Sequence, residues 1–213
     1  MPFWTEKALE PKRQYRFTLE LGTFPDMKFM VKSVNKPAIT IDAKTHNYLN
    51  HEFHYPGRPK WNEVEAKIID AVAPDASYKL SDILLQAGYI VPKTSNQVTT
   101  ISKAAAVDAL GNVTIKQYGP SRSQTGLNEA PGIRPDNKGD APGKATLPKW
   151  DSYGPDGVIE TWTLNNPFIT EINYGALDYA QEELVEIAIK FKYDWATIRA
   201  PDYENGNRQD IWK

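Results

Sequence analysis

Cysteine is absent from this chain of 213 residues, and histidine occurs only three times. The first absence excludes disulfides and thiolate metal sites, and it fits a protein that folds in a reducing compartment. The three histidines, His46, His51 and His54, lie within one short segment. Because residues 51 and 54 of an extended strand project to opposite faces, we predict no metal site and no Ser-His-Asp arrangement.

Long apolar runs and an excess of one charge are also lacking. No run approaches the roughly 18 apolar residues that a membrane-spanning helix needs. The first 17 residues mix charges without the apolar centre of a secretion signal. We therefore expect neither a membrane span nor a cleaved signal. The 25 basic and 27 acidic residues give a formal charge of −2, so no basic field favours dedicated nucleic-acid binding.

Catalytic motifs are missing as well: there is no Gly-x-Ser-x-Gly, no Walker-type loop and no Rossmann fingerprint. Neighbouring carboxylates do occur, but a glycosidase needs two of them across a cleft, and most of these fall on solvent-facing sides of predicted strands. We therefore predict a protein that is not an enzyme and needs no cofactor. The carboxylates considered are Glu63, Glu65, Asp178, Glu182, Glu183 and Glu186.

The clearest positive signal is an alternation from Glu183 to Trp195. Apolar side chains fall on one face and charged ones on the other, which indicates a core strand with a solvated back. Such a strand usually carries function as a surface, through assembly or binding. The predicted core face consists of Val185, Ile187, Ile189, Phe191, Tyr193 and Trp195, and the polar face of Glu186, Lys190, Lys192 and Asp194.

Earlier segments alternate in the same way. Gln14–Leu21 and Met27–Val34 are separated by turn residues, which predicts an antiparallel hairpin. A polar, β-prone arm follows from Ala38 to His54. The Pro-Gly pair in Tyr55–Arg58 suits a type II turn, and a further strand is predicted within Trp61–Ala71.

Two helices are expected between the strands. Asp75–Gly88 has apolar residues at helical spacing, with Asp75 or Ser77 as N-cap and Gly88 after the end. The second lies within Ser95–Leu110, where a run of alanines has high helix propensity. A strand resumes at Val113–Tyr118.

The last part of the chain changes character twice. Residues 119–155 hold six Gly and six Pro without periodicity, which predicts a long loop or insertion. Strands are predicted again at Gly157–Leu164, Phe168–Tyr174 and Glu182–Trp195. The tail, residues 196–213, is polar and predicted to be irregular. We expect residues 1–213 to form a single domain.

Two blocks of sequence carry a family resemblance by their order and spacing. The first is Phe53-His54-Tyr55-Pro56-Gly57-Arg58-Pro59-Lys60-Trp61, which leads into Glu65–Asp70; the second runs from Leu164-x-x-Pro-Phe-Ile to Tyr193-Asp194-Trp195-Ala196. Together they resemble the tail tube proteins of contractile-tailed bacteriophages and, more distantly, the inner tubes of contractile injection systems. The resemblance implies a mainly β (α+β) fold, a two-sheet β-sandwich or barrel with one or two flanking helices.

The resemblance also implies a structural virion protein, assembled in the host cytoplasm into stacked hexameric rings that conduct DNA. Its implied partners are its own copies, the tail sheath protein, the tape-measure protein and the baseplate tube initiator, with DNA passing without tight binding. Under this tube-subunit hypothesis, the arm and turn form the subunit interface. Its predicted residues are Thr40, Lys44, His46, Tyr48, His51, Phe53, Tyr55 and Arg58. A polar face toward the lumen or the outside consists of Lys32, Glu63, Glu65, Lys67, Glu186, Lys190 and Lys192.

Two kinds of alternative stay open at this point. Within the same fold, the chain could be a baseplate ring that initiates a tube, or the inner tube of an injection system. From a different class, the six Trp and eleven Tyr residues suit a carbohydrate-binding β-sandwich, although an aromatic stripe is more often core than site.

Overall fold

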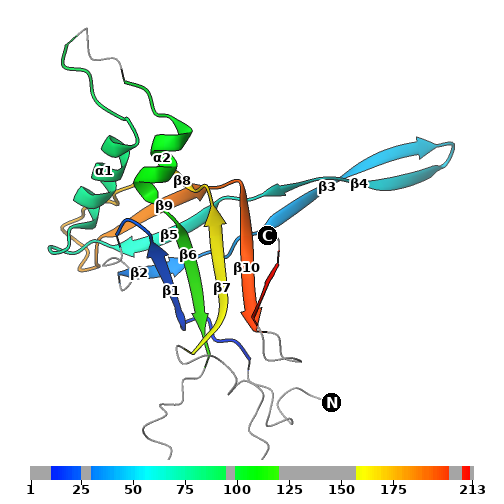
Figure 1. Ribbon diagram of the computed structural model, residues 1–213, viewed down its shortest axis with the longest axis horizontal. Helices are drawn as coiled ribbons and strands as arrows, with labels where there is room; N and C mark the ends of the chain where they lie inside the picture. Colours follow the sequence, from blue (N-terminus) through cyan, green and yellow to red (C-terminus); the bar gives the residue numbers. More distant parts are fainter. Residues whose placement is uncertain (1–10, 25–29, 95–98, 120–156, 202–207, 212–213) are drawn as a thin grey trace, which may run out of the picture.

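The computed structural model describes residues 11–24, 30–94, 99–119, 157–201 and 208–211 (Figure 1). These residues form two sheets, a long two-stranded hairpin and two helices. In chain order the elements are β1 (Phe17–Leu21), β2 (Val31–Val34), β3 (Ile39–Tyr48), β4 (His51–Trp61), β5 (Val64–Ile69), α1 (Ala76–Gln86), α2 (Lys103–Leu110), β6 (Val113–Tyr118), β7 (Val158–Asn165), β8 (Phe168–Asn173), β9 (Glu186–Lys192), β10 (Trp195–Pro201) and β11 (Arg208–Ile211).

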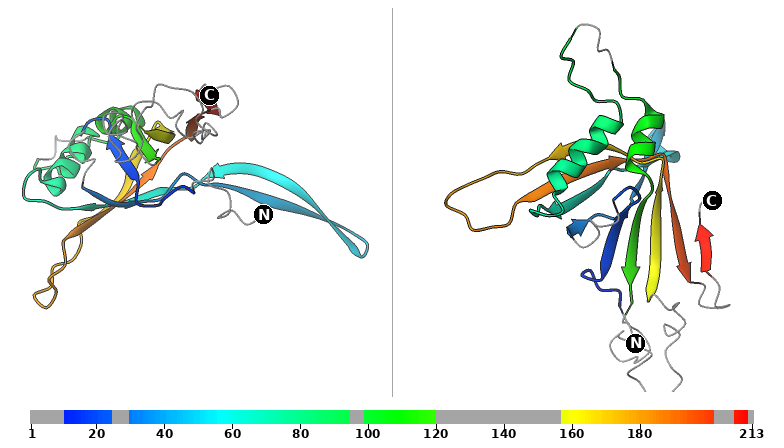
Figure 2. Two further views of the ribbon diagram at one scale, coloured as in Figure 1. Left: turned by 90° about the horizontal axis from the view of Figure 1, so that it is seen from below. Right: turned by 60° about the vertical axis from the view of Figure 1, so that its left-hand side comes forward.

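The two sheets share one hydrophobic core. The five-stranded sheet has the order β1-β6-β7-β10-β11, and the four-stranded sheet has the order β2-β5-β9-β8. Among the described strands, β3 and β4 pair only with each other, and they extend away from both sheets (Figures 1 and 2). We call this hairpin, Ile39–Trp61, the arm.

In the central strands of the four-stranded sheet, β5 and β9, buried apolar residues alternate with more exposed ones. On β5, Val64, Ala66 and Ile68 are buried, and they lie opposite Phe191, Ile189 and Ile187 of β9, which are buried too. Burial of a large apolar side chain stabilises a fold by roughly 1.5–3 kcal/mol. These six positions therefore fix the register, because a slip by one residue would turn them to solvent.

Both helices follow their sequence signals. The Asp75 carboxylate accepts a hydrogen bond from the Tyr78 N–H at 2.8 Å and so caps α1, while Ser102 caps α2 in the same way. Leu80 and Ile83 of α1 are buried against the core. In the described part of the chain, neither helix is long and apolar enough to cross a membrane.

The predicted hairpin between the first two strands is wrong. β1 pairs with β6, where Leu19 lies opposite Ile115 and Leu21 opposite Val113, and β2 pairs with β5 in the other sheet. All four of these side chains are buried. β1 pairs with the distant β6 because β6 supplies an apolar face for Leu19 and Leu21 to pack against. Pairing with the nearby β2 would only lower the entropy cost of closing the loop.

The predicted long strand from Glu183 to Trp195 is two strands. β9 ends at Lys192, and the chain then crosses into the five-stranded sheet as β10. Asp194 holds the crossing: it accepts hydrogen bonds from Lys103 Nζ at 2.7 Å and from Asn166 Nδ2 at 2.8 Å, and these contacts lower its pKa. Tyr193 is buried as predicted, but Trp195 is 41% exposed rather than in the core.

The predicted irregular tail is also wrong where the structure describes it. Residues 195–201 form β10 between β7 and β11, and residues 208–211 form β11 at the edge of the same sheet. The polar sequence of residues 208–211 is compatible with a strand because β11 lies at the edge of the sheet. Residues 120–155 of the predicted insertion lie outside the described residues.

Candidate functional site

The arm carries every residue predicted for the subunit interface. Each residue of β3 is exposed, and β4 is exposed except for partly buried Gly57 and Trp61. A two-stranded hairpin is marginally stable in water by itself, and the described arm buries none of its side chains fully. The structure places Thr40, Lys44, His46 and Tyr48 on β3 and His51, Phe53, Tyr55 and Arg58 on β4.

The turn of the arm lies at Leu49–Asn50, not at the predicted Tyr55–Arg58. Tyr48 pairs with His51 across this turn, and Leu49 has a positive φ of 52°. The structure instead has a bulge inside β4: Ile41 pairs with Pro59 and Ala43 with Pro56, so Gly57 and Arg58 together lie opposite Asp42. A Cβ atom on Gly57 would lie 2.5 Å from the Asp42 carbonyl oxygen, so only glycine permits this close approach.

Apolar and aromatic side chains gather at the free end of the arm. Leu49 is 87% exposed, and Tyr48, Phe53 and Tyr55 are also exposed. His51 packs edge-on against Phe53, with ring centroids 4.6 Å apart. A solvated hairpin that presents such side chains has the character of a contact surface.

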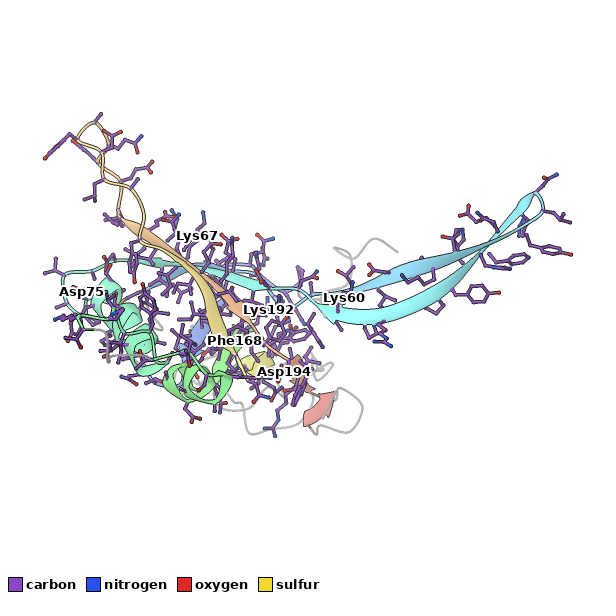
Figure 3. All side chains as sticks on the ribbon, turned by 90° about the horizontal axis from the view of Figure 1, so that it is seen from above. Lys60, Lys67, Asp75, Phe168, Lys192 and Asp194 are labelled. Carbon is purple, nitrogen blue, oxygen red and sulfur yellow. The ribbon has the colours of Figure 1, made fainter. Side chains whose placement is uncertain are left out.

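The root of the arm is held firmly to the body. Thr40 and Asn62, the residue that follows the arm, exchange hydrogen bonds at 2.9 and 3.1 Å. The Lys60–Asp42 pair, at 2.8 Å, joins the two strands of the arm to each other. The Trp61 ring contacts the buried Tyr193 ring, with centroids 5.8 Å apart. Figure 3 shows Lys60 at this root. The arm is therefore anchored at one end and free at the other.

A buried carboxylate fixes the segment that enters the arm. Glu160 on β7 is 4% exposed, and its partners are Lys12, Lys36 and the Trp162 N–H. Burial would raise the pKa of Glu160, but the hydrogen bonds from Lys12, Lys36 and Trp162 outweigh this effect and lower it to about 2. Lys36 also donates to Gln117 at 2.6 Å. This network was not predicted, because no sequence pattern relates Lys36 to Glu160.

The seven residues predicted for a polar face lie together on the outer side of the four-stranded sheet. Glu65 of β5 lies opposite Lys190 of β9, and Lys192 is 3.5 Å from Glu63. Lys32 of β2 reaches Glu186. Lys67 and Lys192 are labelled over this sheet in Figure 3. We call this surface the charged face; it consists of Lys32, Glu63, Glu65, Lys67, Glu171, Glu186, Lys190 and Lys192.

Glu171 on β8 belongs to the charged face, although it was not among the seven predicted residues. Its carboxylate accepts a hydrogen bond from Lys190 at 2.6 Å, which raises the Lys190 pKa. The alternation of β8 is broken by a register shift between Ile169 and Glu171, so periodicity could not assign its face. The hydrogen bond between Lys32 and Glu186 raises the pKa of the lysine and lowers that of the glutamate.

The charged face is balanced as well as polar. Its four lysines stand among four glutamates, so it presents no net positive surface on which a polyanion would release counterions. The described residues contain no group of three or more His, Asp or Glu side chains placed to hold a metal ion. The charged face is therefore a surface of paired charges with no excess of either sign.

No protein-family model matches this sequence, and no significantly similar sequence was found among curated proteins. Solved structures do match. A chain of the anti-feeding prophage cap, described as the tube-terminating cap, aligns with 14% identity over 94% of this chain and 99% of its own, with a TM-score of 0.52.

Two chains from an extracellular contractile injection system named PVC match equally well. One, from the sheath–tube complex in the extended state, is 16% identical over 91% of this chain and 95% of its own, with a TM-score of 0.52. The other, from the sheath/tube terminator, is 15% identical over 90% and 99%, again with a TM-score of 0.52. The chain thus shares its fold with chains from the tube and sheath assemblies of contractile injection systems, and the mainly β fold implied by the resemblance is confirmed.

Proposed function

We propose that this protein is a structural tube subunit, without catalytic activity, whose copies close into hexameric rings that stack into a hollow tube. The observation that carries the proposal is the four-stranded sheet, which buries one face, presents balanced charges on the other and has two edges without partners in the described chain. The proposal is also supported by the fold that this chain shares with chains of contractile injection systems.

The strand directions allow the sheet to continue from copy to copy. Each neighbouring pair in the order β2-β5-β9-β8 is antiparallel. With an even number of alternating strands, β8 of one copy is antiparallel to β2 of the next when the copies are related by rotation. Such a heterologous contact closes into a ring, and it satisfies the open edges by strand addition.

The size of the resulting barrel is sufficient for a channel. Six copies of a four-stranded sheet would give roughly 24 strands, and a spacing of about 4.8 Å between strands gives a backbone diameter of roughly 40 Å. Barrels of about 16–18 strands already leave an aqueous channel. The apolar side of the sheet is covered by the rest of the subunit, so the charged face would line the lumen.

A lumen of this kind suits the passage of a charged polymer. Repeated basic contacts along a stack of rings would oppose the sliding of DNA, whereas a wall of ion-paired lysines and glutamates does not. We propose DNA as the cargo, a sheath protein around the tube, a tape-measure protein within it and a baseplate protein that initiates it, in a phage tail assembled in the host cytoplasm. A protein effector is the alternative cargo, because the structural matches come from injection systems.

A second candidate function has a specific observation in its favour. Two of the matching structures are described as a cap and a terminator, so the chain could form a single ring at the end of a tube. A baseplate ring that initiates a tube would have the same property.

Electron microscopy of the purified protein tests these functions. We expect rings that join into tubes of indefinite length, whereas rings that never stack would favour a terminal or initiating ring. A monomer that persists at high concentration and in the presence of sheath and baseplate proteins would contradict the proposal. Retention of such a monomer on a polysaccharide column would instead favour a carbohydrate-binding module.

A further inference from the structure

The loop between β8 and β9, residues 175–184, leans toward the charged face of the four-stranded sheet. In Figure 2 it leaves the sheet on the side opposite α1 and α2, and in Figure 3 it lies on the side where Lys67 is labelled. Lys67 belongs to the charged face, which lines the lumen in the proposed tube. The β8–β9 loop of each copy would therefore project into that lumen.

The β8–β9 loop is held to the body at its two ends. On one side, the hydroxyl groups of Tyr174 and Ser81 share a hydrogen bond at 2.9 Å. On the other, the Val185 carbonyl accepts a hydrogen bond from the Asp70 N–H at 2.9 Å. Between these points, residues 175–184 are all exposed. The loop is thus a projection with a fixed root.

The side chains of the loop are of two kinds, apolar and acidic, and they border a hollow of about 740 Å³. Leu177 is 87% exposed, and the loop contains neither lysine nor arginine. The apolar members are Leu177, Tyr179 and Leu184, and the acidic members are Asp178, Glu182 and Glu183. A partner that offers both apolar and cationic side chains would match this surface.

We propose that the six β8–β9 loops of a ring form an acidic collar inside the channel, and that this collar holds a polypeptide with lysine or arginine beside apolar side chains. The collar rests on the proposed function, because it requires a ring with the charged face turned inward. Each loop runs out and back, so it reaches at most about 17 Å from a wall of roughly 20 Å radius. Since the loops lean along the sheet as well as inward (Figure 2), they leave an opening comparable with one α-helix, about 10–12 Å across.

The charge of the collar decides between a polypeptide and nucleic acid. Six copies bring the carboxylates of Asp178, Glu182 and Glu183 into one narrow zone, which attracts cations and repels phosphate. Exposed Leu177 and Tyr179 offer contacts to apolar side chains, which a sugar–phosphate backbone does not have. The occupant of the collar is therefore the polypeptide that fills the channel, and not DNA.

The collar can give way to a wider polymer that follows. Because residues 175–184 are all exposed, displacing the loop toward the wall breaks no core contact, and segments of this kind move at low cost in free energy. Electrostatic repulsion would keep DNA from adhering to the displaced loops. Holding of a polypeptide and free passage of DNA are thus compatible in one channel.

Thiol accessibility tests where the loops lie, because the chain has no cysteine of its own. Ala176→Cys places a thiol in the loop, and Gln86→Cys places the matched control on the exposed end of α1. In assembled tubes, a small maleimide should label both variants. A maleimide coupled to a globular protein wider than the barrel, roughly 40 Å, should label Gln86→Cys and react at least about tenfold more slowly with Ala176→Cys.

The labelling outcomes separate the collar from the proposed function. Absence of rings and tubes in the wild type overturns both. Tubes in which the large reagent labels both thiols equally overturn the collar alone, because the loop then lies outside the channel. Tubes in which even the small reagent does not reach Ala176→Cys would place the loop between subunits, and they also overturn the collar.

A synthetic helical peptide of leucine and lysine tests the occupant. We expect it to sediment with wild-type tubes and to dissociate as salt is added. Glu182→Gln with Glu183→Gln should weaken this binding at least about tenfold. Asp82→Asn with Asp108→Asn removes the same charge from α1 and α2 and should bind the peptide like the wild type. Equal binding by the two double variants would contradict the proposal.

The apolar part of the site has its own pair of variants. Leu177→Ser should weaken peptide binding at least about threefold, whereas Leu85→Ser, at a 52% exposed position on α1, should leave it unchanged. Duplex DNA provides the opposite charge and should not sediment with the tubes. If DNA bound as tightly as the peptide, or if both leucine variants bound the peptide equally, the assigned occupant would be wrong.

Discussion

Lys36 Nζ lies 2.7 Å from Glu160 Oε1, and this contact joins the segment that enters the arm to β7 of the five-stranded sheet. The Glu160 side chain is 5% exposed and has a second lysine partner in Lys12. Removing one member of a buried ion pair leaves the other uncompensated. The position of the arm is thus tied to a buried charge on the five-stranded sheet.

The substitution Glu160→Gln should lower the free energy of unfolding by about 2–3 kcal/mol, because two lysines and an indole N–H lose their anionic acceptor. Chemical denaturation monitored by tryptophan fluorescence measures this loss. Glu171→Gln is the matched control: Glu171 is exposed and pairs with Lys190 on the surface, so its loss should cost less than about 1 kcal/mol. Equal losses for the two variants would contradict the assigned role of Glu160.

The contribution of Glu160 should depend on pH in a defined direction. Its pKa falls from 4.5 to about 2 in the folded protein. A carboxyl group of this kind stabilises the fold above its unfolded pKa, and the stabilisation is lost as the pH falls through the folded value. The advantage of the wild type over Glu160→Gln, at most about 3 kcal/mol, should be complete above pH 4.5 and shrink toward pH 2. An advantage that stays constant from pH 7 to pH 3 would show that Glu160 does not titrate in this way.

Reversing two charges on the charged face should convert it into a DNA-binding surface. The double variant Glu63→Lys with Glu65→Lys adds four units of positive charge beside Lys190 and Lys192, so we expect binding to duplex DNA that weakens steeply with salt. Fluorescence anisotropy at two salt concentrations measures it. Asp82→Lys with Asp108→Lys makes the same change on the helices and should bind at least about tenfold more weakly in assembled tubes. Equal binding by the two variants would argue against a lumenal charged face.

A side chain at Gly57 should damage assembly without damaging the fold. In Gly57→Ala the added Cβ meets the Asp42 carbonyl oxygen and distorts the bulge of the arm. Because the arm buries no core residue, the unfolding free energy should change by less than about 0.5 kcal/mol, while the yield of tubes falls about tenfold. Sedimentation of assembled material measures the second effect.

The matched control for Gly57 is Gly22→Ala. A Cβ on Gly22 would lie 2.8 Å from the Asn112 backbone nitrogen, within the body of the protein. This variant should lose about 1–3 kcal/mol of stability. If Gly57→Ala destabilised the fold as strongly as Gly22→Ala, the arm would be part of the cooperative core.

Hydrophobic periodicity predicted the strands that have one apolar and one polar face. It did not predict which strands pair with each other. The alternation of β5 and of Ile187, Ile189 and Phe191 was predicted correctly, and so was the strand at Val113–Tyr118. Asp75 was one of two N-caps predicted for α1, whereas the start of α2 at Ser102 was left open. The partners of β1 and β2 were not predicted correctly, because many apolar strands are compatible and only packing chooses among them. The Pro56-Gly57 pair was taken for a turn, since a bulge and a turn draw on the same residues.

The two candidate surfaces differ in how far sequence could describe them. Seven members of the charged face were predicted strand by strand, but their convergence depends on the register that sets Glu65 opposite Lys190. The arm was recognised by its shortage of apolar residues, although its turn was misplaced. The exposed apolar residues Leu177 and Tyr179, in the loop between β8 and β9, were not predicted because they show neither helical nor strand spacing.

On the charged face, each of three ion pairs joins two residues of the same subunit. Lys32 with Glu186, Lys190 with Glu171, and Lys192 with Glu63 all neutralise one another locally. In the proposed tube, the electrostatic potential that the charged face adds along the channel axis would therefore not accumulate as rings are added. A polymer would meet the same weak, alternating field from this face at every ring, so the work of transport past the wall would grow with the length of the polymer and not with the charge of the wall.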